Sequence, residues 1–182
     1  MNKAVLLSVQ PKWCELIVSG KKTVEVRKTR PKLETPFKAY IYQTKKTWVY
    51  NIFSKIADWQ GKVIGEFVCN KIYEIGYDYF YPCGYEVSMG EISRKELYKK
   101  SCLSFCQIDD YLNMELGYGW HISNLVIYDK PKELSEFKKI NRECWYADLG
   151  LAKRDCPECQ NKECFLQRPP QSWCYVEGVE TE

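Results

Sequence analysis

The stretch Gly20-Lys21-Lys22-Thr23-Val24-Glu25-Val26-Arg27 decides how this chain is interpreted. The preceding residues 12–19 have helical spacing, and glycine is a common residue at which a helix ends. The stretch then alternates, so the two valines share one face of a strand while Glu25 and Arg27 share the other. Lys22 lies at the turn, where its long side chain can reach that second face. The pattern predicts a helix–strand corner that gathers two cations and one carboxylate.

Two interpretations of this corner remain open. In the first, Arg27 and Lys22 bind a phosphate through charge-assisted hydrogen bonds. Glu25 then accepts hydrogen bonds from base amino groups or holds Arg27 in place. In the second, the three charges form a ladder on a solvent-facing strand, where such pairs contribute little.

Short strands and helices are expected on both sides of the corner. The expected strands cover residues 4–9, 23–28, 37–44, 61–73, 122–128 and 171–177. One helix is expected to begin at Pro11, and a second at Ser93, which forms a capping-box pattern with Glu96. A third is expected from about Ser104 to Leu116. A short helix is expected through Leu134 and Phe137. Breaks are expected at 76–90, at Gly117 and Gly119, and at a turn over 129–131. Because these strands lack a βαβ rhythm, an α+β fold with a small mixed barrel is favoured over a doubly wound sheet.

Positive charge is concentrated in the first third of the chain. Residues 1–60 hold 12 Lys and Arg against 4 Asp and Glu, whereas residues 61–182 hold 15 against 20. This asymmetry indicates an anionic partner for the first third. Lysines scattered over solvated faces would give the same count.

Neither a membrane helix nor a secretory signal is expected. No apolar run approaches the ~20 residues that a membrane helix needs. The apolar start is short and ends at residues 10–12, so we interpret it as a first strand and the protein as cytoplasmic.

Ten cysteines are present, which is a high number for a chain without a secretory signal. Clustered thiols in a reducing compartment favour a metal over disulfides. The cluster Cys156, Cys159, Cys164 and Cys174 predicts a structural Zn²⁺ site with four thiolates. Cys144 competes as a ligand, and four reduced thiols near a terminus are the alternative. Scattered thiols are expected to fill core space: Cys14, Cys69, Cys83, Cys102 and Cys106.

A family resemblance bears on the choice between these interpretations. The pattern Gly-x-Lys-x-x-Glu-x-Arg, matched at Gly20, Lys22, Glu25 and Arg27, resembles the signature of the ASCH family, which has bacterial and phage members. Residues 6–12, 61–67 and 119–123 also look like that family. The resemblance covers roughly residues 3–75, 119–140 and 168–173.

The resemblance implies a PUA-like mixed β-barrel, closed by five or six strands, with flanking helices and a cleft lined by the signature. In this chain the barrel would occupy residues 1–150, with a helical insert at about 76–118 that is also a possible protein-binding surface. A Cys-rich appendix, residues 151–182, would return a final strand to the barrel.

The implied function is binding of RNA or a modified nucleotide. The expected ligand-binding residues are Lys22, Glu25, Arg27, Lys12, Lys28, Arg30 and, as a ring on which a base stacks, Tyr42. Tyr40 and Trp48 are further stacking candidates.

The alternative is a hydrolase acting on acylated nucleosides of the N4-acetylcytidine type, or on RNA as a ribonuclease. The amidohydrolase branch of similar proteins uses a lysine, a threonine and a glutamate. Lys22 matches the lysine, but Glu25 occupies the place of the threonine, so the nucleophile is missing. Glu66 would supply an acid/base group, giving Lys22, Glu25 and Glu66 as the catalytic set. The single histidine, His121, is expected to be packed or hydrogen-bonded rather than catalytic.

Overall fold

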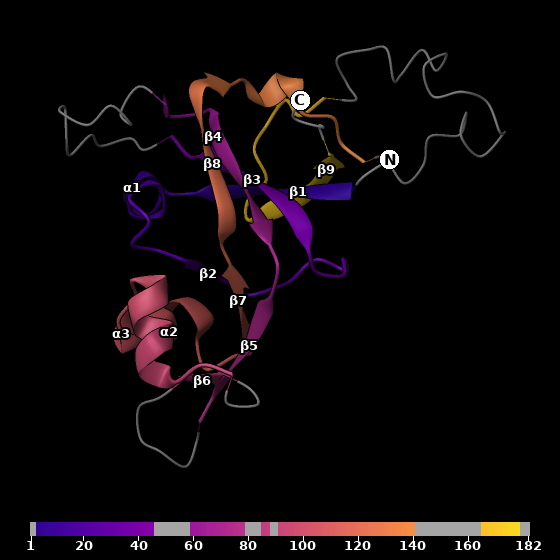
Figure 1. Ribbon diagram of the computed structural model, residues 1–182. Coiled ribbons are helices and arrows are strands. Elements are labelled where there is room, and N and C mark those ends of the chain that lie inside the picture. The colour runs from indigo at the N-terminus through magenta and orange to yellow at the C-terminus, as the bar shows by residue number, and fades with distance from the viewer. Residues whose placement is uncertain (1–2, 46–58, 79–84, 88–90, 141–164, 179–182) are drawn as a thin grey trace, which may run out of the picture. The chain divides into compact units, whose positions relative to one another are not determined.

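The computed structural model describes residues 3–45, 59–78, 85–87, 91–140 and 165–178 (Figure 1). Its elements follow in the order β1 (Lys3–Val9), α1 (Pro11–Val18), β2 (Val24–Arg27), β3 (Phe37–Gln43), β4 (Val63–Cys69), β5 (Ile72–Tyr77), β6 (Tyr85–Val87), α2 (Arg94–Ser101), α3 (Phe105–Leu112), β7 (Gly117–His121), β8 (Ser123–Lys132), a 3-10 helix (Leu134–Glu136) and β9 (Trp173–Glu177). The α+β class predicted from the sequence is confirmed. None of the helices in these ranges has the length and apolar character needed to cross a bilayer.

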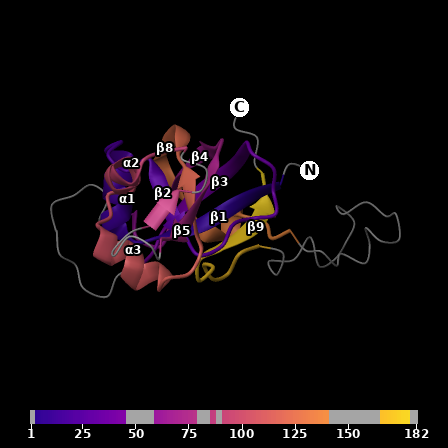
Figure 2. The same ribbon diagram turned by 90° about the horizontal axis from the view of Figure 1, so that it is seen from below.

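The described strands form two sheets. One has the order β8-β4-β3-β1-β9, in which β1 is parallel to β3 and antiparallel to β9 (Figure 2). The other has the order β2-β7-β5-β6, with antiparallel pairs from β2 to β7, from β7 to β5 and from β5 to β6. A single closed barrel was expected, whereas each sheet has two edge strands in the order of the strands described here.

The chain divides into two compact units. The first comprises residues 1–11, 38–66 and 127–182, and the second comprises residues 12–37 and 67–126. The core of the first unit includes Leu6, Tyr40, Tyr42, Phe137 and Val176. The core of the second unit packs the buried faces of α2 and α3 against β5 and β6 through residues such as Ile75, Tyr85, Leu97, Ile108 and Leu112.

Capping boxes start both helices of the second unit that follow β6. The Ser93 hydroxyl accepts a hydrogen bond from the Glu96 N–H, and the Glu96 carboxylate accepts one from the Ser93 N–H. Ser104 and Gln107 repeat the arrangement at α3. Both predicted starts are therefore confirmed. The predicted end at Leu116 is wrong, because the chain turns into a left-handed conformation at Asn113, directly after α3.

Several expected breaks and strands differ in the structure. The expected loop over residues 76–90 contains the end of β5 and all of β6. Residues 61–73 were expected to form one strand, but β4 ends at Cys69 and β5 begins at Ile72 in the other sheet. Six of the seven residues of β4 are buried, so its sequence does not mark where the chain leaves one sheet for the other. Residues 129–131 were expected to turn, yet they lie within β8, which is an edge strand and therefore tolerates a proline.

Gly117 and Gly119 continue a strand instead of breaking one. A Cβ atom on Gly117 would lie 2.5 Å from Leu112 Cδ1, and one on Gly119 would lie 3.0 Å from Val24 Cγ1. These glycines are therefore explained by close packing of β7 on its neighbours, since a side chain at either position would displace a buried residue.

Candidate functional site

The corner between α1 and β2 forms as predicted. Gly20 has a φ of +70°, a left-handed conformation that glycine adopts without strain. The Lys22 N–H then donates to the Leu16 carbonyl at 2.9 Å. This contact turns the chain at the end of α1 and delivers Lys22 to the start of β2.

Two donors from this corner bind the carboxyl end of α2. The Thr23 N–H donates to the Lys100 carbonyl at 2.8 Å, and Lys22 Nζ donates to the Ser101 carbonyl at 2.7 Å. The last carbonyls of a helix have no partner within the helix, and its carboxyl end carries partial negative charge. The start of β2 therefore caps α2, and Lys22 supplies the cation.

Glu25 bridges the two cations of the signature. Glu25 Oε2 lies 3.2 Å from Lys22 Nζ, and Glu25 Oε1 lies 2.9 Å from Arg27 Nη2. Lys22, Glu25 and Arg27 are 2%, 7% and 6% exposed. The interpretation as a solvent-facing charge ladder is therefore wrong, because all four residues of β2 are buried.

Burial changes what this triad contributes. Charged groups are removed from water at a high cost unless they are paired and hydrogen-bonded. Each Glu25 oxygen takes one cation, so the triad holds two positive charges on one negative charge. Such a triad has one positive charge in excess, which favours an anionic group over a cationic one nearby.

Trp13 and Cys14 border the triad on α1. The Trp13 ring centroid lies 5.2 Å from Lys22 Nζ and 4.1 Å from the Nζ of the exposed Lys12. Cys14 is fully buried, and this burial, followed by the charge of Glu25, raises the pKa of its thiol. Cys14 therefore remains a protonated packing residue, as the sequence predicted.

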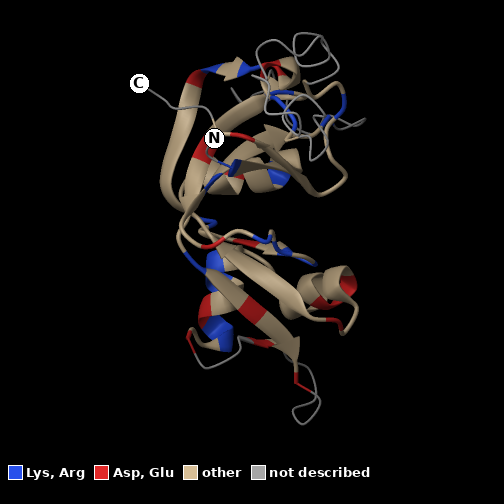
Figure 3. Cartoon of the chain, turned by 90° about the vertical axis from the view of Figure 1, so that its right-hand side faces the viewer, with Lys and Arg blue, Asp and Glu red and all other residues tan. Residues whose placement is uncertain are grey.

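A run of exposed cations follows β2. Lys28, Arg30 and Lys32 are exposed (Figure 3 shows Lys and Arg in blue). Lys28 Nζ lies 5.7 Å from the centroid of the Tyr111 ring, and Arg30 Cζ lies 5.7 Å from that of Tyr118. Sequence reasoning missed both tyrosines, since only the pairing of β2 with β7 and the placement of α3 bring them to these cations.

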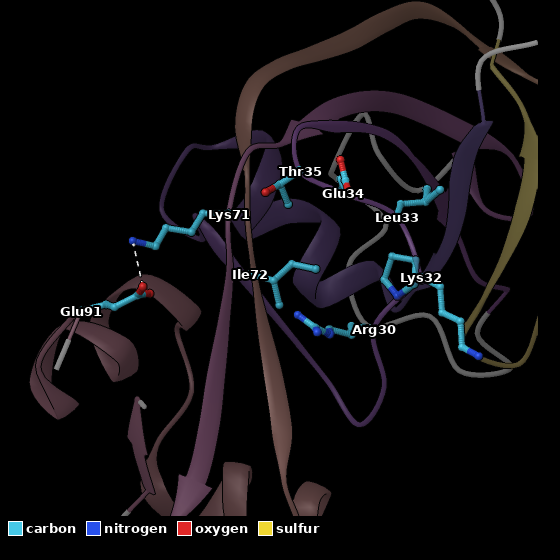
Figure 4. A pocket seen from close by; sticks show the side chains of 9 residues that line it. Arg30, Lys32, Leu33, Glu34, Thr35, Lys71, Ile72 and Glu91 are labelled. Atoms are coloured by element: carbon cyan, nitrogen blue, oxygen red, sulfur yellow. Dashed lines mark ion pairs between the residues drawn. The ribbon is translucent and has the colours of Figure 1, made fainter. Parts of the chain in front are cut away.

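A cavity of about 920 Å³ lies in the second unit (Figure 4). Its walls come from the loop after β2, from the start of β5 and from the segment before α2: Arg30, Pro31, Lys32, Leu33, Glu34, Thr35, Lys71, Ile72 and Glu91. Of the predicted ligand-binding residues, Arg30 lines this cavity, while Lys22, Glu25 and Arg27 are not among its lining residues.

Tyr42 and Glu66 belong to the first unit. Tyr42 is 4% exposed and Tyr40 is fully buried, so the expectation of exposed stacking rings at these positions is wrong. Trp48 lies outside the described residues. Glu66 is buried, with Oε1 2.9 Å from Lys38 Nζ and Oε2 accepting the Tyr128 hydroxyl at 2.5 Å. Burial, and then the Glu66 carboxylate, raises the pKa of Tyr128.

His121 is hydrogen-bonded, as expected. Its Nδ1 lies 2.7 Å from Asn70 Oδ1, and its ring meets that of Tyr73 edge to face. Burial lowers the pKa of His121, and the charges of Lys100 and Lys71 lower it further. The imidazole is therefore held neutral near pH 7.

The predictions for the cysteines have different outcomes. Cys156, Cys159, Cys164, Cys144 and Cys83 lie outside the described residues, so the zinc site stays a prediction. Cys174 is half-buried on β9, and burial raises the pKa of its thiol to about 11. Cys69 is buried, as expected, whereas Cys106 is exposed and Cys102 is half-buried. Within the described ranges, no three His, Cys, Asp or Glu side chains group so as to hold a metal.

Comparison with known proteins identifies the family. Residues 7–105, more than half of the 182-residue chain, match the ASCH domain, so the chain belongs to the ASCH domain family. This is a PUA-like family of RNA-binding domains. No curated protein matches the chain.

Two solved structures from Zymomonas mobilis show a weak likeness. One is a mutant ZmASCH protein, with 21% identity over 73% of this chain and 77% of that chain and a TM-score of 0.49. The other is ASCH from the same organism, with 19% identity over 96% of this chain and 87% of that chain and a TM-score of 0.48. The family assignment rests on the match over residues 7–105.

Proposed function

We propose that this chain binds RNA through the second unit, with the exposed cations after β2 contacting phosphates. The observation that carries this proposal is the buried triad of Lys22, Glu25 and Arg27, which holds excess positive charge where the exposed run of Lys28 and Arg30 begins. Consecutive cations at this spacing suit a phosphate backbone, and nearby tyrosine rings suit unpaired bases.

Individual roles follow from the contacts. Lys22 is already engaged with the Ser101 carbonyl and Glu25, so we assign it to positioning. Glu25 holds the guanidinium of Arg27, whose planar group suits a phosphate. Lys28, Arg30 and Lys12 are exposed and supply the outer contacts.

Salt dependence of RNA affinity tests the proposal. A ligand held by several phosphate contacts loses affinity steeply as salt rises, because binding releases condensed counterions. Replacing both Lys28 and Arg30 by alanine should weaken binding and reduce the salt slope by about 1.4 for two lost contacts on a single strand. The matched control is a double Lys95→Ala and Lys130→Ala variant, which removes two exposed cations elsewhere. Absence of RNA binding at low salt would contradict the proposal.

An enzyme that hydrolyses acylated nucleosides or RNA is the alternative. Two arguments weigh against it. The family resemblance implies a threonine at the position of Glu25 in the hydrolases, and the Lys22 ammonium contacts a carbonyl and a carboxylate. Turnover of an acetylated cytidine or of RNA that is lost in Lys22→Ala, with folding intact, would support it.

A further inference from the structure

The cavity of the second unit combines groups that pair with each other and groups that do not. Lys71 Nζ lies 3.2 Å from Glu91 Oε1, so these two charges largely satisfy one another (Figure 4). Arg30 and Glu34 are both exposed, and neither has an ion-pair partner among the residues that the structure describes. Lys32 also lines the cavity, but it has an interaction of its own. Among the described lining residues, Arg30 and Glu34 are therefore the cation and the anion without an ion-pair partner.

Within the described ranges, no group takes the hydrogen-bond donors of the Arg30 guanidinium. Its Cζ lies 5.7 Å from the Tyr118 ring centroid, a distance at which a cation is attracted to the face of an aromatic ring. A cation–π contact leaves the N–H groups of a guanidinium available for a planar or tetrahedral anion. Arg30 is thus oriented for an anionic ligand.

An apolar surface separates the two free charges. In Figure 4, Ile72 lies between Arg30 on one side and Glu34 with Thr35 on the other. Leu33 and Pro31 add further apolar lining. With a volume of about 920 Å³, the cavity falls within the usual range for small-ligand sites, which combine apolar walls with a few polar groups.

We propose that this cavity binds one nucleotide unit, with its phosphate on Arg30, its base against Ile72, and Glu34 accepting hydrogen bonds from base or ribose donors. A nucleotide carries an anion, a flat ring system and hydrogen-bond donors, which complement the cation, the apolar surface and the carboxylate of the cavity walls. The inference rests on the proposed function, since it assigns a subsite for one nucleotide of the bound RNA. A free nucleotide has the same chemistry and is the second source.

Binding of small probes to the folded chain tests the subsite. The probes are the four ribonucleoside 5′-monophosphates, the corresponding nucleosides and inorganic phosphate, with affinities measured by calorimetry. At least one nucleotide should bind more tightly than its nucleoside and than phosphate. Arg30→Ala should weaken that nucleotide about tenfold and leave the nucleoside unchanged, because it removes a charge-assisted hydrogen bond to phosphate. Glu34→Gln should weaken nucleotide and nucleoside alike.

Matched variants separate the subsite from general charge effects. Lys95→Ala and Glu74→Gln change exposed residues outside the cavity lining and should leave every affinity unchanged. Equal binding of nucleotide and phosphate, or wild-type affinities in both cavity variants, would overturn the inference.

Competition with RNA distinguishes the two sources. If the subsite binds one nucleotide of RNA, a saturating concentration of free nucleotide should lower the affinity for RNA. If the nucleotide leaves RNA affinity unchanged, the cavity binds free nucleotides instead. The subsite alone would be overturned if the wild type binds RNA with the expected salt dependence while Arg30→Ala and Glu34→Gln bind nucleotides with wild-type affinity. Nucleotide binding without any RNA binding would overturn the proposed function alone.

Discussion

Glu25 is the residue on which the arrangement at the start of β2 depends. Its two oxygens take Lys22 and Arg27 separately, at 3.2 Å and 2.9 Å. Without this carboxylate, two like charges would remain buried with one another. The signature glutamate therefore has a structural role whether or not a ligand contacts it.

Replacing Glu25 by glutamine should destabilise the chain. Leaving buried charges without their partner costs about 3–5 kcal/mol, since the cations have no water to replace the carboxylate. Chemical denaturation measures this loss. The control Glu74→Gln changes an exposed carboxylate on β5 and should stay within about 0.5 kcal/mol of the wild type. Equal stability of the two variants would show that the triad does not require the negative charge.

His121 predicts a pH dependence of stability. Burial lowers the pKa of His121 in the folded chain. Near the ordinary histidine pKa of about 6.5, the unfolded chain therefore binds the proton more readily than the folded chain does. The free energy of unfolding should therefore fall as pH drops through that value. The charges that face the ring are Lys71 and Lys100, and its other neighbours are Asn70 and Tyr73.

Denaturation at pH 7.5 and 5.5 in wild type and His121→Gln measures the contribution of this histidine. The variant should lose less stability than the wild type over that interval, because glutamine does not titrate. An identical loss in both proteins would contradict the assignment.

Among the elements, β7 can form where it does because its two glycines leave room for neighbouring side chains. Gly117 lies against the fully buried Leu112 of α3, and Gly119 lies against Val24 of β2. Local sequence suggested a break here because glycine is common in turns. The strand forms because its neighbours need the space that a Cβ would occupy.

Gly117→Ala should therefore destabilise the second unit. The added Cβ would lie 2.5 Å from Leu112 Cδ1, and overpacking a filled core costs about 1–3 kcal/mol. Gly76→Ala on β5 is the matched control, since nothing lies within 4 Å of a Cβ at that position. Thermal unfolding of both variants should show a loss for Gly117→Ala only, and a loss of the same size in both would point to backbone effects.

At the scale of the whole molecule, the chain passes between its two units after residues 11, 37, 66 and 126. The sequence suggested one boundary, near residues 149–154, which lies outside the described residues. The units are defined by contacts between distant segments, which composition along the chain does not mark. Glu66 thus belongs to the first unit and Lys22 to the second, a division that spacing alone does not reveal.

Zinc is the remaining prediction for the whole chain. Four thiolates from Cys156, Cys159, Cys164 and Cys174 should bind one Zn²⁺ per chain in a tetrahedral structural site. Metal analysis of the purified protein measures the stoichiometry. Cys159→Ser should abolish metal binding, while Cys106→Ser, which changes an exposed thiol outside the cluster, should not. A folded wild-type protein without zinc would contradict the prediction.

Short-range sequence patterns were sufficient to predict the local features of the corner. Helical spacing, the turn at Gly20, the alternation of β2 and the two capping boxes all depend on residues within a few positions of each other. Such short-range patterns correctly predicted α1, β2 and the starts of α2 and α3. The family signature drew attention to the same corner.

The surroundings of those charges, in contrast, depend on contacts between segments that are distant in the sequence. Lys22 donates to Ser101, which is 79 residues away, and this contact buries the triad against α2. Arg30 meets Tyr118 because β2 pairs with β7, and the cavity walls join the loop after β2 to β5 and Glu91. The periodicity and spacing of residues in the sequence indicate which residues share a face of a helix or strand. They do not indicate which distant segment covers that face. Burial of the corner therefore required the distant segments to be placed.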